Sequence, residues 1–143
     1  MAIRRIDSLG YQIGLLGRLY DRHLQDALKE FGVAPGQFAP LVMLFEQDGL
    51  TQADLCRRIN VEQPTMANTL GRMERDGLIK RKSDTVDKRR TLVFLTSKAK
   101  DVQNKIMNAV RDVSHHALDG LSATEQDEAF RLLSRMIENL ASR

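Results

Sequence analysis

One segment, Gly49 to Lys100, decides the fold of this chain: GLTQADLCRRINVEQPTMANTLGRMERDGLIKRKSDTVDKRRTLVFLTSKAK. Thr51 and Asp54 have the spacing of a capping box, which predicts that a helix begins at Thr51. After a short break, Pro64 suits the first turn of a second helix, where its missing N–H costs little. These signals predict two short helices joined by a tight turn.

The second of these helices has one apolar face and one polar face. Met66, Leu70 and Met73 recur at steps of four and three, which predicts a buried stripe. The opposite face carries side chains that suit the major groove, because Asn pairs with adenine, Arg with guanine, and Thr with a base or a phosphate. The candidate groove residues are Gln63, Thr65, Asn68, Thr69, Arg72 and Arg75.

Two strands are predicted after the helix pair. Leu78 to Lys82 and Thr91 to Leu95 have the composition of strands, and an eight-residue polar loop separates them. The loop contains a basic cluster, Lys88, Arg89 and Arg90. Two helices, a tight turn and a hairpin with a basic loop are typical of a winged helix-turn-helix, whose second helix enters the major groove.

The charge of the chain is segregated. Arg57 to Lys100 contain twelve Lys and Arg against five Asp and Glu, or +7, while the remaining residues sum to −4. A basic block on an acidic scaffold favours a polyanionic partner, since phosphate contacts need clustered cations. Two alternatives stay open: an uneven solvated surface, and a winged-helix module that binds an acidic protein.

Amphipathic helices are predicted on both sides of the hairpin and the helix pair. One runs as far as Phe31 and another from Pro35 to about Gln47. After Thr96 two more follow, and the last begins with Ser122 and Glu125 at capping-box spacing. The outer helices carry apolar stripes that a chain of 143 residues has little room to bury, so a second copy would cover them by symmetry.

The segment from Gly49 to Lys100 resembles the DNA-binding core of the MarR family of bacterial transcriptional regulators. The wing pattern of that family, Asp-x-Arg followed by Leu-Thr, is matched by Asp87, Arg89, Leu95 and Thr96. The stretches LTQADL and ERDGLI and the Pro-Thr pair in the second helix also match, as does the layout of the flanking helices. The resemblance therefore covers essentially the whole chain.

The resemblance implies a homodimeric winged-helix repressor or activator that binds a pseudo-palindromic operator. It implies a mainly α fold with a small β-hairpin wing, in which residues 1–143 form one domain and residues 35–96 form the winged helix-turn-helix core. Residues 1–32 and 97–143 would form the helical dimerisation region. Half-sites would lie about one helical turn, roughly 10 bp, apart.

The family resemblance assigns roles to two residues of the wing loop. The resemblance implies that Arg89 enters the minor groove and that Asp87 holds it by a salt bridge. Physical chemistry agrees, because a narrow minor groove concentrates negative potential and a nearby carboxylate restricts a long side chain. One departure is Glu62, where the family commonly has Ser as the cap of the recognition helix. Another is Ala99, where many members have Gly.

A small-molecule pocket between the dimer helices and the winged core is also implied. In the family such pockets often take aromatic or phenolic anions, so the protein would be a repressor that such a ligand releases from DNA. The candidate lining residues are Tyr11, Leu15, Arg18, Phe38 and Val42.

Sensor chemistry has a weak basis in the sequence. The single cysteine, Cys56, falls beside Leu55 and Ile59 on the inner side of its helix, which favours a small buried residue. His115 and His116 are neighbours, about 100° apart on a helix, which is a poor arrangement for binding one metal ion. A redox-responsive or metal-responsive regulator of the same fold remains an alternative.

Enzyme and membrane functions are not indicated. The chain has no Gly-rich phosphate loop, no HExxH and no recognisable nucleophile motif, so we expect neither catalysis nor a cofactor. No apolar run approaches the roughly 20 residues that span a bilayer, and the N-terminal residues lack the apolar region of a signal peptide. We therefore expect a cytoplasmic protein, associated with the nucleoid when bound to DNA.

Overall fold

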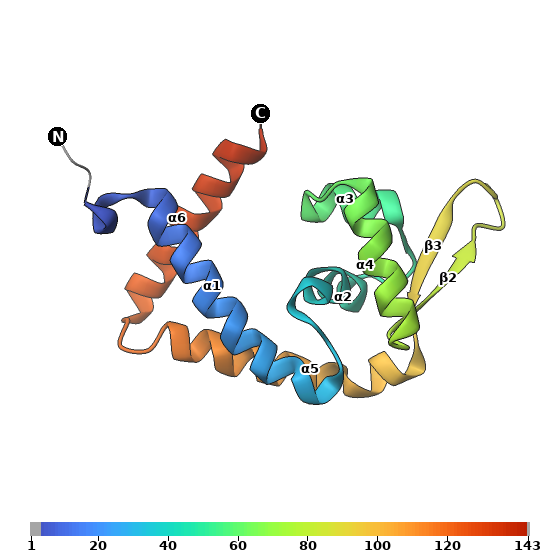
Figure 1. The fold of residues 1–143 in the computed structure, drawn as a ribbon, viewed down its shortest axis with the longest axis horizontal. Helices are drawn as coiled ribbons and strands as arrows, with labels where there is room; N and C mark the ends of the chain where they lie inside the picture. The colour runs from blue at the N-terminus through green and yellow to red at the C-terminus, as the bar shows by residue number, and fades with distance from the viewer. Residues whose placement is uncertain (1–3, 143) are drawn as a thin grey trace. The chain divides into compact units, whose positions relative to one another are not determined.

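The computed structural model describes residues 4–142 and is mainly helical with a small sheet, as predicted (Figure 1). The chain contains, in order, η1 (Arg5–Asp7), α1 (Leu9–Leu28), η2 (Lys29–Phe31), α2 (Pro35–Glu46), β1 (Leu50–Thr51), α3 (Gln52–Ile59), α4 (Gln63–Arg75), β2 (Ile79–Ser83), β3 (Thr91–Leu95), α5 (Ser97–Ala117) and α6 (Ala123–Ala141), where η denotes a 3-10 turn. The chain forms two compact units, which meet in sequence between Val113 and Ser114. Within residues 4–142, no helix has both the length and the apolar character that crossing a membrane requires.

Polar caps begin the helices where the sequence places them. At the start of α3, the Asp54 N–H donates to Thr51 Oγ1 at 3.0 Å, and the Thr51 N–H donates to Asp54 Oδ2 at 3.1 Å. This reciprocal pair is the predicted capping box. The hydrogen bond from the Thr51 backbone, followed by that from the Arg57 side chain, lowers the pKa of Asp54 from its usual 3.8 to about 2. Asp54 is therefore held in its charged form.

Helix α4 buries the predicted stripe completely. Met66 is 1% exposed, and Leu70 and Met73 are fully buried, in contacts with α2, α3 and β2. The helix ends at Arg75, and Gly77 adopts a left-handed φ of +75°, which glycine tolerates without strain. The burial of one face leaves the other face of α4 at the surface.

The sheet contains a strand that the sequence did not predict. Its order is β1-β3-β2, with both pairs antiparallel, and Leu50 of β1 pairs with Val93 of β3. β2 begins and ends one residue later than predicted, at Ile79 and Ser83, and its later end shortens the loop to β3 from eight residues to seven. Gly49, with φ +76°, precedes β1, and a Cβ there would lie 3.0 Å from the Phe94 ring. Glycine thus permits both the turn and the close packing that bring β1 to the sheet.

The core of the first unit draws apolar side chains from α1 to the middle of α5. On α2, Leu41 and Leu44 are buried, while Phe38, Val42 and Phe45 are only half-buried. The apolar residues of α2 lie on more than one side of the helix, so helical spacing alone does not identify its deepest positions. Leu28 of α1 and Ile106 of α5 complete this core with exposures of 0%.

The second unit consists of the end of α5, a turn and α6. The N-cap of α6 is Ser122, whose Oγ accepts the Glu125 N–H at 3.1 Å, as its sequence pattern predicted. The apolar stripe of α6 is uncovered within the described chain. Its exposed fractions are 57% for Phe130, 43% for Leu133, 65% for Ile137 and 75% for Leu140.

Candidate nucleic-acid interface

The outward face of α4 carries most of the residues that the sequence assigned to groove contact. Gln63, Thr65, Asn68, Arg72 and Arg75 are all exposed. Thr69 differs from them, because it is half-buried and its hydroxyl donates to the Thr65 carbonyl oxygen at 3.0 Å. Five of the six side chains are therefore available to a ligand on this face, whereas the Thr69 hydroxyl is engaged with the helix backbone.

The start of α4 is linked to the start of α3 through side chains. Gln52 Nε2 donates to Gln63 Oε1 at 2.9 Å. Glu62, the N-cap of α4, makes no side-chain capping hydrogen bond. The departure of this residue from the Ser common in the family thus has a structural consequence, since the helix begins without the usual side-chain acceptor.

An ion pair ties α4 to the hairpin. Arg81 Nη2 of β2 lies 3.1 Å from Glu74 Oε1 of α4. The hydrogen bond from the Arg81 side chain lowers the pKa of Glu74 below its usual value. On the same strand, the Lys82 ammonium lies 5.7 Å from the centre of the Phe94 ring of β3, within the range of a cation–π contact. The ion pair therefore links α4 to β2, and the cation–π contact links β2 to β3.

The loop of the wing is closed by backbone hydrogen bonds. The Asp84 N–H donates to the Arg90 carbonyl oxygen at 2.9 Å, and the Arg90 N–H donates to the Asp87 carbonyl oxygen at 3.0 Å. The Asp84 carboxylate also accepts the Val86 N–H at 3.0 Å, as in an Asx turn. The loop therefore has a defined geometry, and the Val86 side chain is 93% exposed at its surface.

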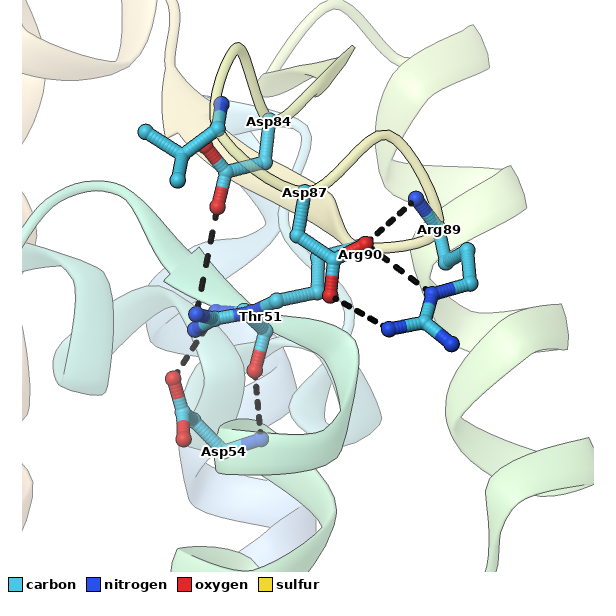
Figure 2. Close-up of polar contacts among 7 residues, drawn as sticks. Thr51, Asp54, Asp84, Asp87, Arg89 and Arg90 are labelled. Atoms are coloured by element: carbon cyan, nitrogen blue, oxygen red, sulfur yellow. Dashed lines mark hydrogen bonds and ion pairs between the residues drawn. The ribbon is translucent and has the colours of Figure 1, made fainter.

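Asp87 and Arg89 form the ion pair that the family resemblance implies (Figure 2). Asp87 Oδ1 accepts both the backbone N–H and Nε–H of Arg89, each at 3.1 Å, and Nη2 lies 3.4 Å from Oδ2. The Arg89 side-chain bond, followed by the backbone bond, lowers the pKa of Asp87 below its usual value. Arg89 remains 91% exposed, so it is oriented without being covered.

A second acid in the loop was not assigned by the sequence. Asp84 Oδ2 lies 3.8 Å from Arg90 Nη1, and the Asp84 side chain is only 15% exposed. The basic cluster identified Arg90 but gave no partner for it. An Asp that begins a tight polar turn is the signal that could have indicated Asp84, since this residue type favours Asx turns.

The residues assigned to a ligand pocket do not line either of two pockets in the first unit. Tyr11, Leu15 and Arg18 are exposed on α1, while Phe38 and Val42 are half-buried on α2. One pocket, of about 260 Å³, is lined mainly by η2 and the residues between η2 and α2, with single residues from α1, from α2 and from the segment just after α4. The other, of about 290 Å³, lies between the start of α3 and the base of the wing loop.

Residues with sensor chemistry are dispersed. Cys56 is half-buried and packs against the core, so it is somewhat more accessible than its sequence position indicated. Among residues 4–142, no group of three or more His, Cys, Asp or Glu side chains is arranged to hold a metal ion.

The helix pair, the three-stranded sheet and the structured loop define a winged helix-turn-helix protein. A sequence model of the MarR family matches residues 33–91. The transcriptional regulator SlyA is 30% identical, and its crystal structure matches with a TM-score of 0.85 over 92% of each chain. A MarR-family regulator from Listeria monocytogenes, crystallised in complex with a 26mer DNA, is 27% identical, with a TM-score of 0.86 over 94% of this chain and 90% of that one.

Among curated proteins, the helix-turn-helix-type transcriptional regulator YybA of Bacillus subtilis is 27% identical over 129 residues, which cover 90% of this chain and 86% of YybA. The chain belongs to the MarR family of transcriptional regulators. Its relatives are regulators of transcription and not enzymes, as the sequence predicted.

Proposed function

We propose that this protein represses transcription as a homodimer that binds a pseudo-palindromic operator in double-stranded DNA. The observation that carries the proposal is the wing arginine: Arg89 is 91% exposed and is oriented by two side-chain contacts with Asp87. An exposed, oriented guanidinium suits a narrow minor groove, where negative potential is concentrated. The DNA-bound relative from Listeria monocytogenes gives independent support.

The outward face of α4 would enter the major groove and read base edges. Asn68 and Arg72 lie at exposed positions on that face, where bidentate contacts with adenine and guanine are geometrically suited to their side chains. Lys88 and Arg90 would contact the sugar-phosphate backbone from the wing, and Arg75 would do so from the end of α4. Asp87 would act by positioning Arg89 rather than by touching DNA.

The dimer would form through the helices within residues 1–32 and 97–143, outside the winged core of residues 35–96. The support is the exposure of apolar side chains on helices of both flanks, including Leu16 at 56% on α1 and Ile137 at 65% on α6. A second copy would cover such stripes, since a two-fold interface uses the same surface on both subunits.

A small aromatic or phenolic anion would release the repressor from DNA. Its pocket would form on dimerisation, because the proposed lining residues border neither pocket of the first unit. These residues are Tyr11, Leu15 and Arg18 of α1 with Phe38 and Val42 of α2, and Arg18 would supply the cation for an anionic group. Salicylate is a suitable probe: we expect it to weaken DNA binding by the wild-type protein and to have less effect on Arg18→Ala. A DNA-binding repressor of this kind acts in the cytoplasm.

The test of DNA recognition begins with selection of bound sequences from genomic DNA, followed by affinity measurements on the enriched site at several salt concentrations. We expect one pseudo-palindromic motif. Arg89→Ala should weaken binding by about tenfold and lower the slope of log affinity against log salt by about one. Lys29→Ala, which removes a cation from η2, is the matched control and should change neither quantity.

If selection enriched no motif and no duplex bound specifically at about 100 mM salt, the protein would not be a sequence-specific DNA-binding regulator. In that case the basic face would better suit an acidic protein partner. If the motif were found but Arg89→Ala kept the wild-type affinity and salt slope, the DNA-binding function would stand and the assignment of the wing would be wrong.

A further inference from the structure

Two neighbouring arginines of the wing loop are held in different directions by two different acids. Figure 2 shows Arg89 on one side of the loop, bonded to Asp87, and Arg90 extending back toward Thr51. The side chain of Arg89 is 91% exposed, whereas that of Arg90 is 54% exposed. The family pattern Asp-x-Arg includes Arg89 only, so Arg90 and its partner Asp84 need a separate explanation.

The ion pair between Asp84 and Arg90 leaves the guanidinium with free hydrogen-bonding capacity. Asp84 Oδ2 lies 3.8 Å from Arg90 Nη1, which is beyond the usual length of an N–H···O hydrogen bond. A guanidinium has five N–H donors in a planar fork, so an attraction at this distance directs the side chain without using its donors. Asp84 itself is fixed, because its other oxygen accepts the Val86 N–H.

Arg90 lines a pocket at the start of α3. The pocket has a volume of about 290 Å³ and is lined by Thr51, Gln52, Ala53, Arg89, Arg90 and Thr91. Gln52 and Ala53 belong to the first turn of α3, where backbone N–H groups have no partner within the helix. Asp54, the acid of the same turn, is paired with Arg57 at 2.7 Å. The pocket thus combines a guanidinium with the positive end of a helix.

The pocket is also connected to the helix that would read the operator. Gln52, which lines the pocket, donates through Nε2 to Gln63 Oε1, and Gln63 is the first residue of α4. An anion held in this pocket would therefore lie at a fixed place relative to both the recognition helix and the wing. A phosphate of the DNA backbone is the anion that a regulator of this class brings to such a place.

We propose that Arg90 and the first turn of α3 form a seat for one backbone phosphate in each operator half-site, and that Asp84 is the residue that positions Arg90 over it. This inference rests on the proposed DNA-binding function and adds a role separate from that of Arg89. Arg89 would sense the width of the minor groove, whereas the Arg90 seat would fix the register of α4 along the duplex.

The experiment replaces the phosphates of the selected operator one at a time with uncharged methylphosphonates and measures the affinity of the full-length protein. For the wild-type protein, we expect one position in each half-site to lose about tenfold in affinity through Arg90, the scale of a charge-assisted hydrogen bond. Arg90→Ala removes the contact from both half-sites of the homodimer, so it should lose that factor twice, roughly a hundredfold, on unmodified DNA and become insensitive to the replacement in either half-site. Arg89→Ala, the matched control, should remain sensitive to it.

Asp84→Asn separates positioning from net charge. Asn keeps the side-chain oxygen that accepts the Val86 N–H, but it removes the negative charge that attracts Arg90. If charge alone mattered, loss of an acid beside DNA would strengthen binding. If Asp84 positions Arg90, the Asp84→Asn variant should instead bind the operator a few-fold more weakly. It should also lose less affinity than the wild-type protein when the phosphate bound by Arg90 is replaced with a methylphosphonate. Thermal unfolding of each variant verifies that the fold is retained.

Three outcomes would contradict the proposal that Arg90 and the first turn of α3 bind a backbone phosphate. The first is a wild-type protein that binds specifically but has no phosphate whose penalty disappears in Arg90→Ala. The second is a penalty that disappears equally in Arg89→Ala, since the two arginines would then share one role. The third is tighter binding by Asp84→Asn. A wild-type protein with no specific DNA site would overturn the proposed function as well, which distinguishes that failure from the others.

Discussion

Helices α4 and α6 have the same kind of sequence pattern but different surroundings. On α4, Met66, Leu70 and Met73 are at most 1% exposed because α2, α3 and the sheet cover them. On α6, the residues of the apolar stripe are far more exposed, with exposed fractions from 43% for Leu133 to 75% for Leu140. Amphipathic periodicity predicts that a face will be covered, but it does not say whether the same chain or another copy covers it.

The difference has thermodynamic consequences. Burial of the α4 stripe occurs when a single chain folds, so it contributes to the stability of the winged core at any protein concentration. Burial of the α6 stripe would occur only on association, and its contribution would depend on protein concentration. Substitutions in the two stripes should therefore differ in size and in concentration dependence.

The largest effect is expected for Leu70→Ala in the α4 stripe. Leu70 has an exposure of 0%, and truncation of a fully buried leucine costs about 2–5 kcal/mol of unfolding free energy. Urea unfolding at several protein concentrations measures this quantity. Ile137→Ala on α6 is the control, and at the lowest concentration it should cost well below 1 kcal/mol.

Equal losses for Leu70→Ala and Ile137→Ala at every concentration would contradict the comparison. The stripe of α6 would then belong to a core of the single chain. A cost of Ile137→Ala that grows with protein concentration would instead support coverage by a second copy.

A somewhat smaller effect is expected for Ile137→Lys, measured as dimer dissociation. If the proposed dimer covers the α6 stripe, a charge placed on that stripe should raise the dimer dissociation constant about 30-fold or more, because each subunit contributes the same substitution. Sedimentation across a concentration series gives the constant. Asn139→Lys adds the same charge at an exposed position of α6, and it should leave the dimer nearly unchanged.

The elements of the winged core were largely predictable because local signals and tertiary contacts agree there. The capping box at Thr51, Pro64 in the first turn of α4 and the apolar stripe of α4 each appear in the structure as predicted. β1 was missed because it has only two residues, Leu50 and Thr51, and the cap of α3 dominates the same stretch. A pairing that depends on β3, more than 40 residues further on, leaves no local pattern.

The candidate nucleic-acid interface likewise contains some features that the sequence predicted and others that it did not. The exposed positions of α4 and the pair of Asp87 with Arg89 follow from periodicity and from the family pattern. The role of Asp84 does not, because its contact with Arg90 depends on how the seven residues of the loop close. Thr69 was placed among the groove residues by its spacing, but its hydroxyl bonds to the helix backbone, a choice that spacing cannot predict.

Removal of a helix cap tests the comparison between the winged core and α6 with a smaller expected change in stability. Thr51→Ala removes the side-chain acceptor at the start of α3 and should cost about 1 kcal/mol of unfolding free energy. Ser122→Ala removes the equivalent acceptor at the start of α6 and should cost only a few tenths of a kcal/mol at low concentration, since fewer contacts depend on that helix. Urea unfolding measures both variants. A larger loss for Ser122→Ala than for Thr51→Ala would show that α6 is as integral to folding as the winged core.

The smallest expected effect is a pH dependence that arises in the capping box. Asp54 has a pKa of about 2 in the folded protein and 3.8 ordinarily, so folding favours its charged form. The resulting stabilisation is fully present above about pH 4 and is lost as pH falls through about 2. Asp54→Asn should lower the unfolding free energy by roughly 0.5–1 kcal/mol at pH 7 and by less at pH 2. Urea unfolding at pH 7, 4 and 2 measures the difference, which should narrow on acidification because only the wild-type protein loses a charged cap. A difference that stayed constant from pH 7 to 2 would mean that the charge of Asp54 does not stabilise the start of α3.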